Sequence, residues 1–466
     1  MNTVSGMSYK IMNFKRTILM LIRLSNLAVL TAVFAYTWYT VYSQPVLPGA
    51  ATEFFRKGHW LVVIIYGCLL MAFTQLNGGY RVGDYRITEM IYSNFISIIF
   101  INIIYYFVIA LMWRAFPQMR SMMIMTAIQF IYVFLWCYIS NKFYFKLYKA
   151  REVLFLYEAE TPSIVLDKMN RRYDKYHISD VVRITDSVNF KDVIKGYDAV
   201  ALDRVNPSLR EQCIRDCYAQ NVRLYLVPSF DDVILESSMM INLLDTPLYL
   251  MKNRGLSFEQ ELLKRFFDLL ISVIVLLVLS PIMVLVALLI KLEDGGAVFY
   301  RQNRLTIGGK IFRIYKFRSM RENAEADGKA VLMQKDDDRI TRVGRVIRKC
   351  RLDELPQLLN VIQGDMSLIG PRPERPEIAE EYYQTMPEFS FRLSGKAGIT
   401  GYAQVMGKYN TTPYDKLVFD LMYLENYSLL FDIKIALMTL KTVFNAEATE
   451  GVKREETSIY ADDEYE

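Results

Sequence analysis

Two adjacent carboxylates, Asp353 and Glu354, stand in the stretch RKCRLDELPQLLNVIQGDMSLIGPRP, which spans residues 348–373. Arginines precede the pair, and a Gly-Pro-Arg-Pro turn follows it. An ionised aspartate among cations can attack phosphorus and form an acyl phosphate, if cations or Mg²⁺ neutralise the approach of two anions. An acidic pair before a helix more often serves as a cap. On these residues alone, both interpretations stay open.

The segments on either side of the pair must hold it in place. Pro356 suits the first turn of a helix, so PQLLNVIQ is predicted to be helical and to end near Gly364. The two carboxylates then lie just before a helix N-terminus, where the dipole and free amides favour their charged forms. In the segment IGPRP, Pro371 and Pro373 predict a rigid turn that presents Arg372.

A basic segment precedes the pair. AVFYRQNRLTIGGKIFRIYKFRSM, from Ala297, predicts a hairpin around Gly308–Gly309 whose second strand carries Lys316 and Arg318. In RITRVGRVIRKCR every third residue is an arginine, which places these side chains along one ridge of a helix. A solvated face, attachment to anionic lipid and a phosphorylated substrate all fit such a ridge. The aromatic residues suit strand core better than base stacking, so nucleic acid is not expected as a partner.

The composition indicates a membrane protein with soluble domains. The chain has 466 residues, of which 53% are hydrophobic and 14% aromatic, with a net charge of +5. Five scattered cysteines are expected to be reduced and mostly buried thiols. Only two histidines occur, which argues against a zinc cluster and against histidine-based acid–base catalysis.

Four apolar stretches open the chain, at about residues 17–43, 59–76, 90–113 and 121–140. Each approaches the roughly 20 residues that cross a bilayer. Basic residues before the first stretch, after the fourth and between the second and third favour four crossings with both ends in the cytoplasm. Residues 1–150 are therefore predicted to form a four-helix transmembrane region.

A fifth apolar run, residues 266–292, has basic residues at both ends: Lys264 and Arg265 before it, Lys291 after it. Near its middle, Pro281 removes a backbone donor and predicts a kink, while the Ser280 hydroxyl can satisfy the freed carbonyl. We expect a re-entrant helix that enters the membrane and returns to the same face. The alternative is a kinked but complete crossing.

Residues 151–255 predict a Rossmann-like α/β domain. The short apolar runs at 153–157, 178–184, 199–203 and 222–228 read as buried strands, and PSLREQCIRDCYAQN between the last two reads as a helix. A dinucleotide site needs a glycine-rich turn after the first strand, but EAETPS stands there. The sequence therefore favours a structural or regulatory role for this domain over a cofactor site.

Several motifs of the C-terminal part together resemble one family. KRFFDLL, the Ser-Pro break, YKFRSM, LDELPQLLNVIQGDMSLIGPRP, GITGYAQVMG and FDLMYLENYSLLFDIKI, over residues 264–444, are similar to those of the bacterial sugar transferases, or large monotopic phosphoglycosyl transferases. The resemblance implies a mostly α catalytic domain, residues 256–450, which moves a sugar 1-phosphate from a UDP-sugar to undecaprenyl phosphate and releases UMP. It also implies a place in the bacterial cytoplasmic membrane, with the catalytic domain facing the cytoplasm and initiating exopolysaccharide or capsule synthesis.

The resemblance also assigns roles to residues. Asp353 would be the nucleophile, Glu354 its dyad partner, and Mg²⁺ would bridge the two carboxylates and the diphosphate. Ser280 and Pro281 would form the break of the re-entrant helix. The substrate-binding set that it implies is Arg348, Arg372, Lys316, Arg318, Pro371, Pro373 and Asp420.

Other functions compete with this one. A transferase of amino sugars and a non-enzymatic scaffold or nucleotide-sugar sensor are the alternatives, and the intact Asp353–Glu354 pair favours an enzyme. The transferred sugar is expected to be glucose or galactose on family grounds only. The N-terminal helices and the α/β domain could pair two chains into a homodimer. Residues 451–466 are polar and acidic and predict a disordered tail.

Overall fold

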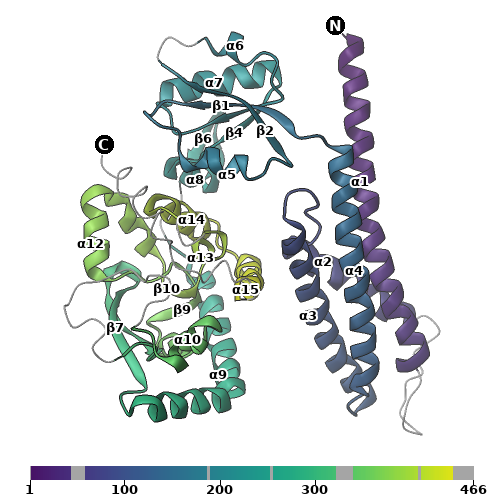
Figure 1. Cartoon of the computed structure of the whole chain (residues 1–466), viewed down its shortest axis with the longest axis vertical. Helices are drawn as coiled ribbons and strands as arrows, with labels where there is room; N and C mark the ends of the chain where they lie inside the picture. Colours follow the sequence, from purple (N-terminus) through teal and green to yellow (C-terminus); the bar gives the residue numbers. More distant parts are fainter. Residues whose placement is uncertain are drawn as a thin grey trace. The chain divides into compact units, whose positions relative to one another are not determined.

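The computed structural model describes residues 2–43, 58–185, 189–251, 255–321, 339–407 and 411–443 (Figure 1). The chain forms two compact units, Met1–Val227 and Pro228–Glu466. The predicted tail, residues 451–466, lies outside the described residues.

The first unit begins with long apolar helices. They are α1 (Asn2–Thr37), which continues into a π-helical turn η1 (Trp38–Tyr42), α2 (Gly58–Leu76), α3 (Ile87–Trp113) and α4 (Met119–Leu147). Each contains a segment long and apolar enough to cross a membrane. Aromatic rings fill the space between them, and Phe34 stacks on Tyr66 with ring centroids 3.8 Å apart.

Uncharged polar side chains join these helices. Asn102 accepts a hydrogen bond from the Tyr66 hydroxyl and donates one to Gln129 Oε1, both at 2.9 Å. Asn26 donates to Asn94 Oδ1 at 3.1 Å. Side-chain amides that bond across helices in an apolar surrounding select one packing, because a shifted helix would leave them unpaired.

The α/β domain follows α4. Its strands are β1 (Arg151–Tyr157), β2 (Tyr176–Arg183), β3 (Ala199–Leu202) and β4 (Arg223–Leu226), all parallel in the order β2-β1-β3-β4. The helices are α5 (Ile164–Asn170), α6 (Phe190–Val193) and α7 (Pro207–Gln220). The four predicted strands and the helix before the last one are confirmed.

The side chain of Asp203 lies at the end of this sheet where the C-termini of its parallel strands meet. Asp203, directly after β3, accepts hydrogen bonds from the backbone N–H groups of Ser163 and Arg204, both at 2.9 Å. The Ser163 amide lies at the start of α5, the helix after β1, where a Rossmann-type domain would offer amides to a phosphate. The anion that these amides bind is therefore the Asp203 carboxylate of the domain itself.

The loop between α2 and α3 contacts the α/β domain. The Arg172 guanidinium donates to the carbonyl oxygens of Asp84, at 3.0 Å, and Gly83, at 3.3 Å, and Lys175 pairs with the Asp84 carboxylate. This loop and the α/β domain thus lie at the same end of the helices, an arrangement that four crossings require.

The second unit starts earlier than the predicted boundary at residue 255. Helix α8 (Phe230–Ser237) packs on α14 (Pro413–Glu425), with Val233 among Leu417, Val418 and Leu421. A β-hairpin follows, made of β5 (Met239–Leu243) and β6 (Thr246–Leu250). The other elements outside the site are α12 (Pro376–Thr385), α13 (Tyr402–Met406) and α15 (Leu429–Val443).

The fifth apolar run is one helix, α9 (Phe258–Asp294), whose ribbon bends sharply along its length (Figure 1). Pro281 lies inside it, and the Ser280 hydroxyl donates to the Leu277 carbonyl at 2.8 Å. Leu277 lies four residues before Pro281, so its oxygen is the acceptor that proline cannot serve. The predicted kink and the predicted role of Ser280 are confirmed.

The helix starts before the predicted residue 266, so two residues taken as basic flanks lie within it. Lys264 is 7% exposed and pairs with Asp432 of α15 at 2.8 Å. Arg265 donates to the carbonyl oxygens of Val361 and Ile362. Both side chains therefore have partners within the protein, a carboxylate for Lys264 and backbone carbonyls for Arg265, and their place beside a membrane segment stays a prediction.

Two small sheets complete the unit. β7 (Phe299–Leu305) and β8 (Ile311–Phe317) form the predicted hairpin, which turns at Gly308 and Gly309 with φ of 66° and 76°. β9 (Met366–Ile369) pairs in parallel with β10 (Ala397–Thr400). β8 carries Lys316, and the turn after β9 carries Arg372. Both of these side chains contact Glu354 of the acidic pair.

Candidate active site

The acidic pair lies in a single 3₁₀ turn, η3 (Leu352–Glu354), between α10 (Arg342–Lys349) and α11 (Gln357–Gln363). α11 ends at Gly364, whose φ of 94° suits only glycine without strain, so the predicted end is confirmed. Arg351, just before the turn, also has a left-handed backbone, with φ of 56°. A non-glycine residue in this region carries strain of about 1–3 kcal/mol, and such strain is common at functional sites.

Glu354 is surrounded by cations. Its Oε1 lies 3.2 Å from Lys316 Nζ and 3.2 Å from Arg372 Nη2, and its Oε2 lies 4.0 Å from Arg351 Nη1. Burial by itself would raise the pKa of Glu354, but the charges of Lys316, Arg372 and Arg351 outweigh it and lower the pKa. Glu354 is therefore a permanent anion that fixes two cations from β8 and from the turn after β9.

Asp353 has the opposite character. Its Oδ1 is buried and has no hydrogen-bond partner among the described residues. Burial and then the charge of Glu354 raise the pKa of Asp353, although Lys316, Arg348 and Arg351 act against the rise. The expectation that the helix N-terminus favours the charged form is wrong for Asp353, because burial and a like charge outweigh the dipole. A carboxylate with an unused oxygen is available as a nucleophile or as a metal ligand.

Positive charge exceeds negative charge around the pair. Four cations, Lys316, Arg348, Arg351 and Arg372, act on the two carboxylates. Burial lowers the pKa of Lys316, with Glu354 opposing and Arg372 adding to the effect. A diphosphate would balance this surplus, because arginine forks and a lysine suit phosphate oxygens.

Arg318 lies away from this site. Its side chain is 9% exposed, pairs with Asp294 at the end of α9 and packs against Gly296. Although Arg318 follows Lys316 by two residues, it lies past the end of β8 and joins the hairpin to α9, and its contact with substrate stays a prediction.

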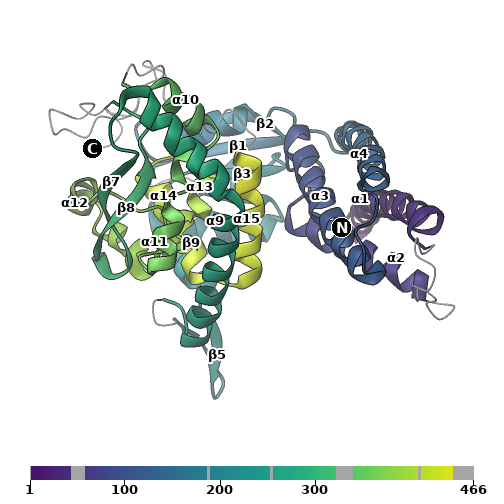
Figure 2. The same cartoon turned by 90° about the horizontal axis from the view of Figure 1, so that it is seen from below.

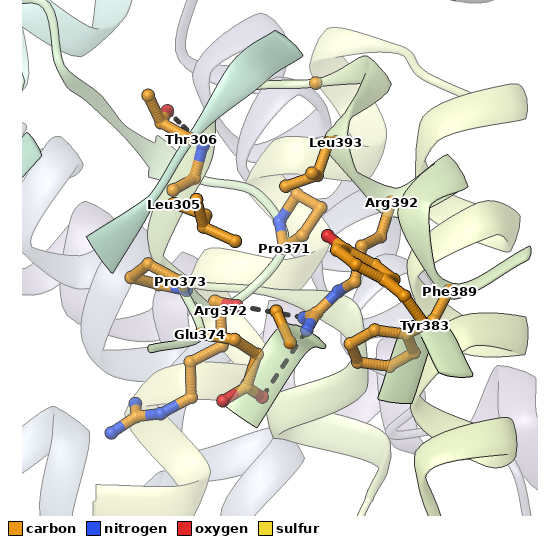
Figure 3. Close-up of a pocket in the computed structure, with 13 residues that line it drawn as sticks. Leu305, Thr306, Pro371, Arg372, Pro373, Glu374, Tyr383, Phe389, Arg392 and Leu393 are labelled. Carbon is orange, nitrogen blue, oxygen red and sulfur yellow. Dashed lines mark hydrogen bonds and ion pairs between the residues drawn. The ribbon is translucent and has the colours of Figure 1, made fainter. Parts of the chain in front are cut away.

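A second buried charge cluster supports the turn that carries Arg372 (Figure 3). Arg392, in η4 (Pro387–Ser394), donates to the Arg372 carbonyl at 2.9 Å and contacts Glu374 at 3.4 Å and Asp420 at 2.7 Å. Asp420 is 1% exposed, and its contact with substrate stays a prediction. It neutralises Arg392, which in turn holds the backbone of Arg372.

The cavity beside this cluster is too small for a substrate. It is lined by Pro371, Pro373 and Tyr383 among others and offers about 10 Å³, room for one water molecule at most. Figure 3 shows the Arg372 side chain extending away from the guanidinium of Arg392. The two prolines thus shape the inner side of the turn, while Arg372 points toward Glu354.

Three cations that contact the site or the turn beside it were not predicted from the sequence: Arg304, Arg351 and Arg392. Arg304 donates to the Pro373 carbonyl at 3.1 Å, and burial followed by the charge of Arg372 lowers the pKa of Arg304 to about 10. Only Arg351 had a signal, its place beside the acidic pair. Arg392 joins the cluster because segments far apart in the sequence pack together, and its local sequence, FRLSG, does not indicate these contacts.

The residues that make this site fall within a match to one family. Residues 259–446 match the bacterial sugar transferases. The chain is also 39% identical, over 193 residues, to a UDP-glucose:undecaprenyl-phosphate glucose-1-phosphate transferase of Caulobacter vibrioides, covering 40% of this chain and 72% of that protein. The chain belongs to the bacterial sugar transferase family.

Longer matches reach relatives with other sugars in their names. One is a UDP-N-acetylgalactosamine-undecaprenyl-phosphate N-acetylgalactosaminephosphotransferase of Aeromonas hydrophila, 38% identical over 261 residues, 53% of this chain and 59% of that protein. Another is an undecaprenyl-phosphate galactose phosphotransferase of Salmonella typhimurium, 35% identical over 271 residues, 54% of this chain and 55% of that protein. The chain thus spans little more than half the length of these two relatives.

Proposed function

We propose that this protein transfers a sugar 1-phosphate from a UDP-sugar to undecaprenyl phosphate and releases UMP. The reaction would be the first membrane step of exopolysaccharide or capsule synthesis. Relatives named for glucose, galactose and N-acetylgalactosamine carry out transfers to undecaprenyl phosphate according to their names. Glucose or galactose is the proposed sugar. An amino sugar is the second candidate, because the relative from Aeromonas hydrophila is named for N-acetylgalactosamine.

The proposed reaction has two displacements at one phosphorus atom. First, the Asp353 carboxylate attacks the β-phosphorus of the UDP-sugar, and the bond from that phosphorus to the oxygen bridging the α-phosphate breaks, so UMP leaves. An acyl phosphate that carries the sugar remains on Asp353. Second, an oxygen of undecaprenyl phosphate attacks the same phosphorus, and the bond to Asp353 breaks to restore the carboxylate.

The observation that carries this proposal is the contrast within the acidic pair. Asp353 has a buried oxygen without a partner among the described residues, while Lys316, Arg351 and Arg372 hold Glu354 ionised. A structural cap would use its oxygens on backbone amides, and no such bond to Asp353 is found in the described part of the chain. The surplus of cations suits a transition state in which negative charge spreads over phosphate oxygens.

Mg²⁺ fits this site only together with a substrate. Asp353 Oδ1 is free to bind it, but the described residues contain no cluster of three or more aspartate, glutamate, histidine or cysteine side chains around one point. Mg²⁺ commonly takes one or two carboxylates and completes its shell with water and substrate phosphates. Asp353 with Glu354 would hold it, and when bound it would neutralise charge that develops on the diphosphate.

The proposed setting is the cytoplasmic membrane of a bacterium. A re-entrant α9 would leave both ends of the helix on the cytoplasmic face, where UDP-sugars are made, and would hold the acidic pair at the depth of a lipid phosphate. The exposed apolar side chains of α9 support membrane contact, with Leu277 70% and Val278 68% exposed.

The decisive assay measures UMP release in nanodiscs containing undecaprenyl phosphate and Mg²⁺. UDP-glucose, UDP-galactose and UDP-N-acetylgalactosamine serve as donors. We expect UMP from at least one donor and a loss of at least about 10³-fold in Asp353→Asn, because that change removes the nucleophile and preserves its size. Lys310→Ala, which removes an exposed ion pair of 3.9 Å with Asp365, is the control and should stay within about twofold.

Two results would contradict the proposal. If no donor yields UMP while UDP-sugars still bind, the protein is a sensor or scaffold. If Asp353→Asn retains full activity, another residue is the nucleophile. Trapping the sugar phosphate on the protein from a radiolabelled donor, in the absence of the lipid acceptor, tests the two-step course directly.

A further inference from the structure

Helix α9 carries a buried polar stripe on one face. Lys264, Asp268 and Ser272 follow one another at four-residue intervals and are 7%, 6% and 0% exposed. The other faces of the helix are apolar and largely exposed. Charged groups are costly to bury, and in an apolar helix they mark a specific interaction. The partners of this stripe therefore indicate what the helix must hold.

Asp268 holds strand β9. Its Oδ1 accepts a hydrogen bond from the Leu368 backbone N–H at 3.2 Å, and its Oδ2 accepts one from the Ser367 hydroxyl at 2.7 Å. The Ser367 oxygen in turn accepts from the Ile369 N–H at 3.3 Å. One side chain of the membrane helix thus fixes three successive residues of the strand.

Lys264 reaches the end of the same strand through two further residues. Its Nζ pairs with Asp432 Oδ2 at 2.8 Å. The Tyr423 hydroxyl lies 2.8 Å from Asp432 Oδ1 and 3.1 Å from the Ile369 carbonyl, and its single proton serves one of them at a time. Figure 2 shows α9 beside α15 and β9, the elements that these contacts join.

The chain after Ile369 has little freedom before it reaches the acidic pair. The Gly370 N–H donates to the Thr400 carbonyl at 2.9 Å, and the Pro371 carbonyl accepts from the Gly398 N–H at 2.9 Å. A Cβ on Gly370 would overlap the Lys396 carbonyl oxygen. Arg372 follows, with its guanidinium 3.2 Å from Glu354. A shift of β9 must therefore shift Arg372.

We propose that Asp268 is a positioning residue through which the membrane helix sets the place of the phosphate-binding Arg372. The insertion of α9 and the geometry of the nucleotide site then form one mechanical unit, although Asp268 touches no substrate. The inference rests on the proposed function, because it takes Arg372 as a ligand of the UDP-sugar diphosphate.

The test compares three variants in the full-length protein in nanodiscs. Asp268→Ala removes both hydrogen bonds to β9. Asp268→Asn retains an oxygen for the Leu368 N–H and an amide that can donate to the Ser367 oxygen. Glu261→Ala is the matched control, because Glu261 is an exposed carboxylate of α9 that pairs with Lys396 at 3.5 Å. The readouts are KM for the UDP-sugar, kcat and the dissociation constant of UDP.

We expect Asp268→Ala to raise KM and the UDP dissociation constant about tenfold, since misplacement of a binding group by about 1 Å can cost up to a hundredfold. Asp268→Asn and Glu261→Ala should stay within about twofold. If Asp268→Ala fails to fold, as judged by pulse proteolysis, Ser367→Ala removes one of the two bonds and should raise both constants about threefold.

A double-mutant cycle with Arg372→Ala separates positioning from a general loss of structure. If Asp268 acts through Arg372, Asp268→Ala weakens UDP binding by less than about twofold in the Arg372→Ala background. The proposal is overturned if the full tenfold effect persists there, or if folded Asp268→Ala binds UDP as wild type does. A wild-type protein that binds UDP but yields no UMP instead refutes the proposed reaction and leaves this test intact.

Discussion

Replacement of Arg392 by leucine offers a quantitative test of the buried cluster beneath Arg372. The guanidinium is 4% exposed and contacts Asp420 at 2.7 Å, Glu374 at 3.4 Å and the Arg372 carbonyl at 2.9 Å. Leucine would leave the Asp420 carboxylate, 1% exposed, without its counter-charge. Breaking a buried pair from one side costs about 3–5 kcal/mol. In a domain of this size that corresponds to a loss of roughly 6–20 °C in melting temperature.

The assay must follow the second unit alone. All four tryptophans lie before residue 140, in the first unit, so their fluorescence does not report on residues 228–466. Pulse proteolysis after heating, with detection of a C-terminal tag, follows the unit that contains Arg392. UDP binding, measured on the same samples below the transition, reports whether the turn around Arg372 is still in place.

Two further variants decide what the cluster contributes. Arg392→Leu combined with Asp420→Leu replaces the pair by apolar side chains and should recover most of the lost stability, because such replacements are often neutral or stabilising. UDP binding should stay weak in the double variant, since the donor to the Arg372 carbonyl is still missing. If Arg392→Leu melts within about 2 °C of wild type, Asp420 is not an uncompensated buried charge and the reasoning fails.

Two other predictions concern Asp353 and Pro281. Asp353→Asn should make the second unit more stable at pH 7. Burial and the charge of Glu354 raise the pKa of Asp353 in the folded protein, so protonation of Asp353 stabilises the fold. This stabilisation is complete below the unfolded-state pKa of about 3.9 and is lost as the pH rises through the folded-state pKa. The gain over wild type should shrink toward pH 4, and a gain independent of pH contradicts this account. For α9, thiols placed at Glu259 and Ala297 in a background without exposed cysteines should react from the same side of the membrane. Pro281→Leu should straighten the helix and move the thiol at residue 297 to the other side, whereas labelling from opposite sides in the unchanged protein would refute re-entry.

Local features of the sequence predicted local structure well. Apolar runs marked the four strands of the α/β domain, glycines marked the turn between β7 and β8 and the end of α11, and the Ser280–Pro281 pair marked the bend of α9. Each of these depends on backbone geometry or on burial within a few residues. That information is contained in a short segment of the chain.

The roles of individual charges were harder to predict, because their partners lie far along the chain. Lys264 and Asp432 are 168 residues apart, and Arg392 and Asp420 are 28 apart. The sequence therefore did not show that Lys264 pairs with Asp432 or that Asp420 pairs with Arg392. Arg318 and Lys316 belong to one motif, yet one pairs with Asp294 and the other with Glu354. A charge next to an apolar run or a motif does not reveal whether the fold has already neutralised it.

The buried charged residues of this unit differ in whether all their polar atoms have partners, and this difference distinguishes supporting residues from the candidate nucleophile. Lys264, Asp268, Arg392 and Asp420 each have close partners, and each holds the segment from β9 to Glu374. Glu354 is likewise satisfied and holds Lys316 and Arg372 in place. Asp353 alone among these carboxylates keeps a buried oxygen without a partner in the described part of the chain, and burial and the charge of Glu354 raise its pKa. A fold that satisfies the neighbours and leaves this one group unsatisfied gives up stability at the point where a phosphorus atom could supply the missing bond.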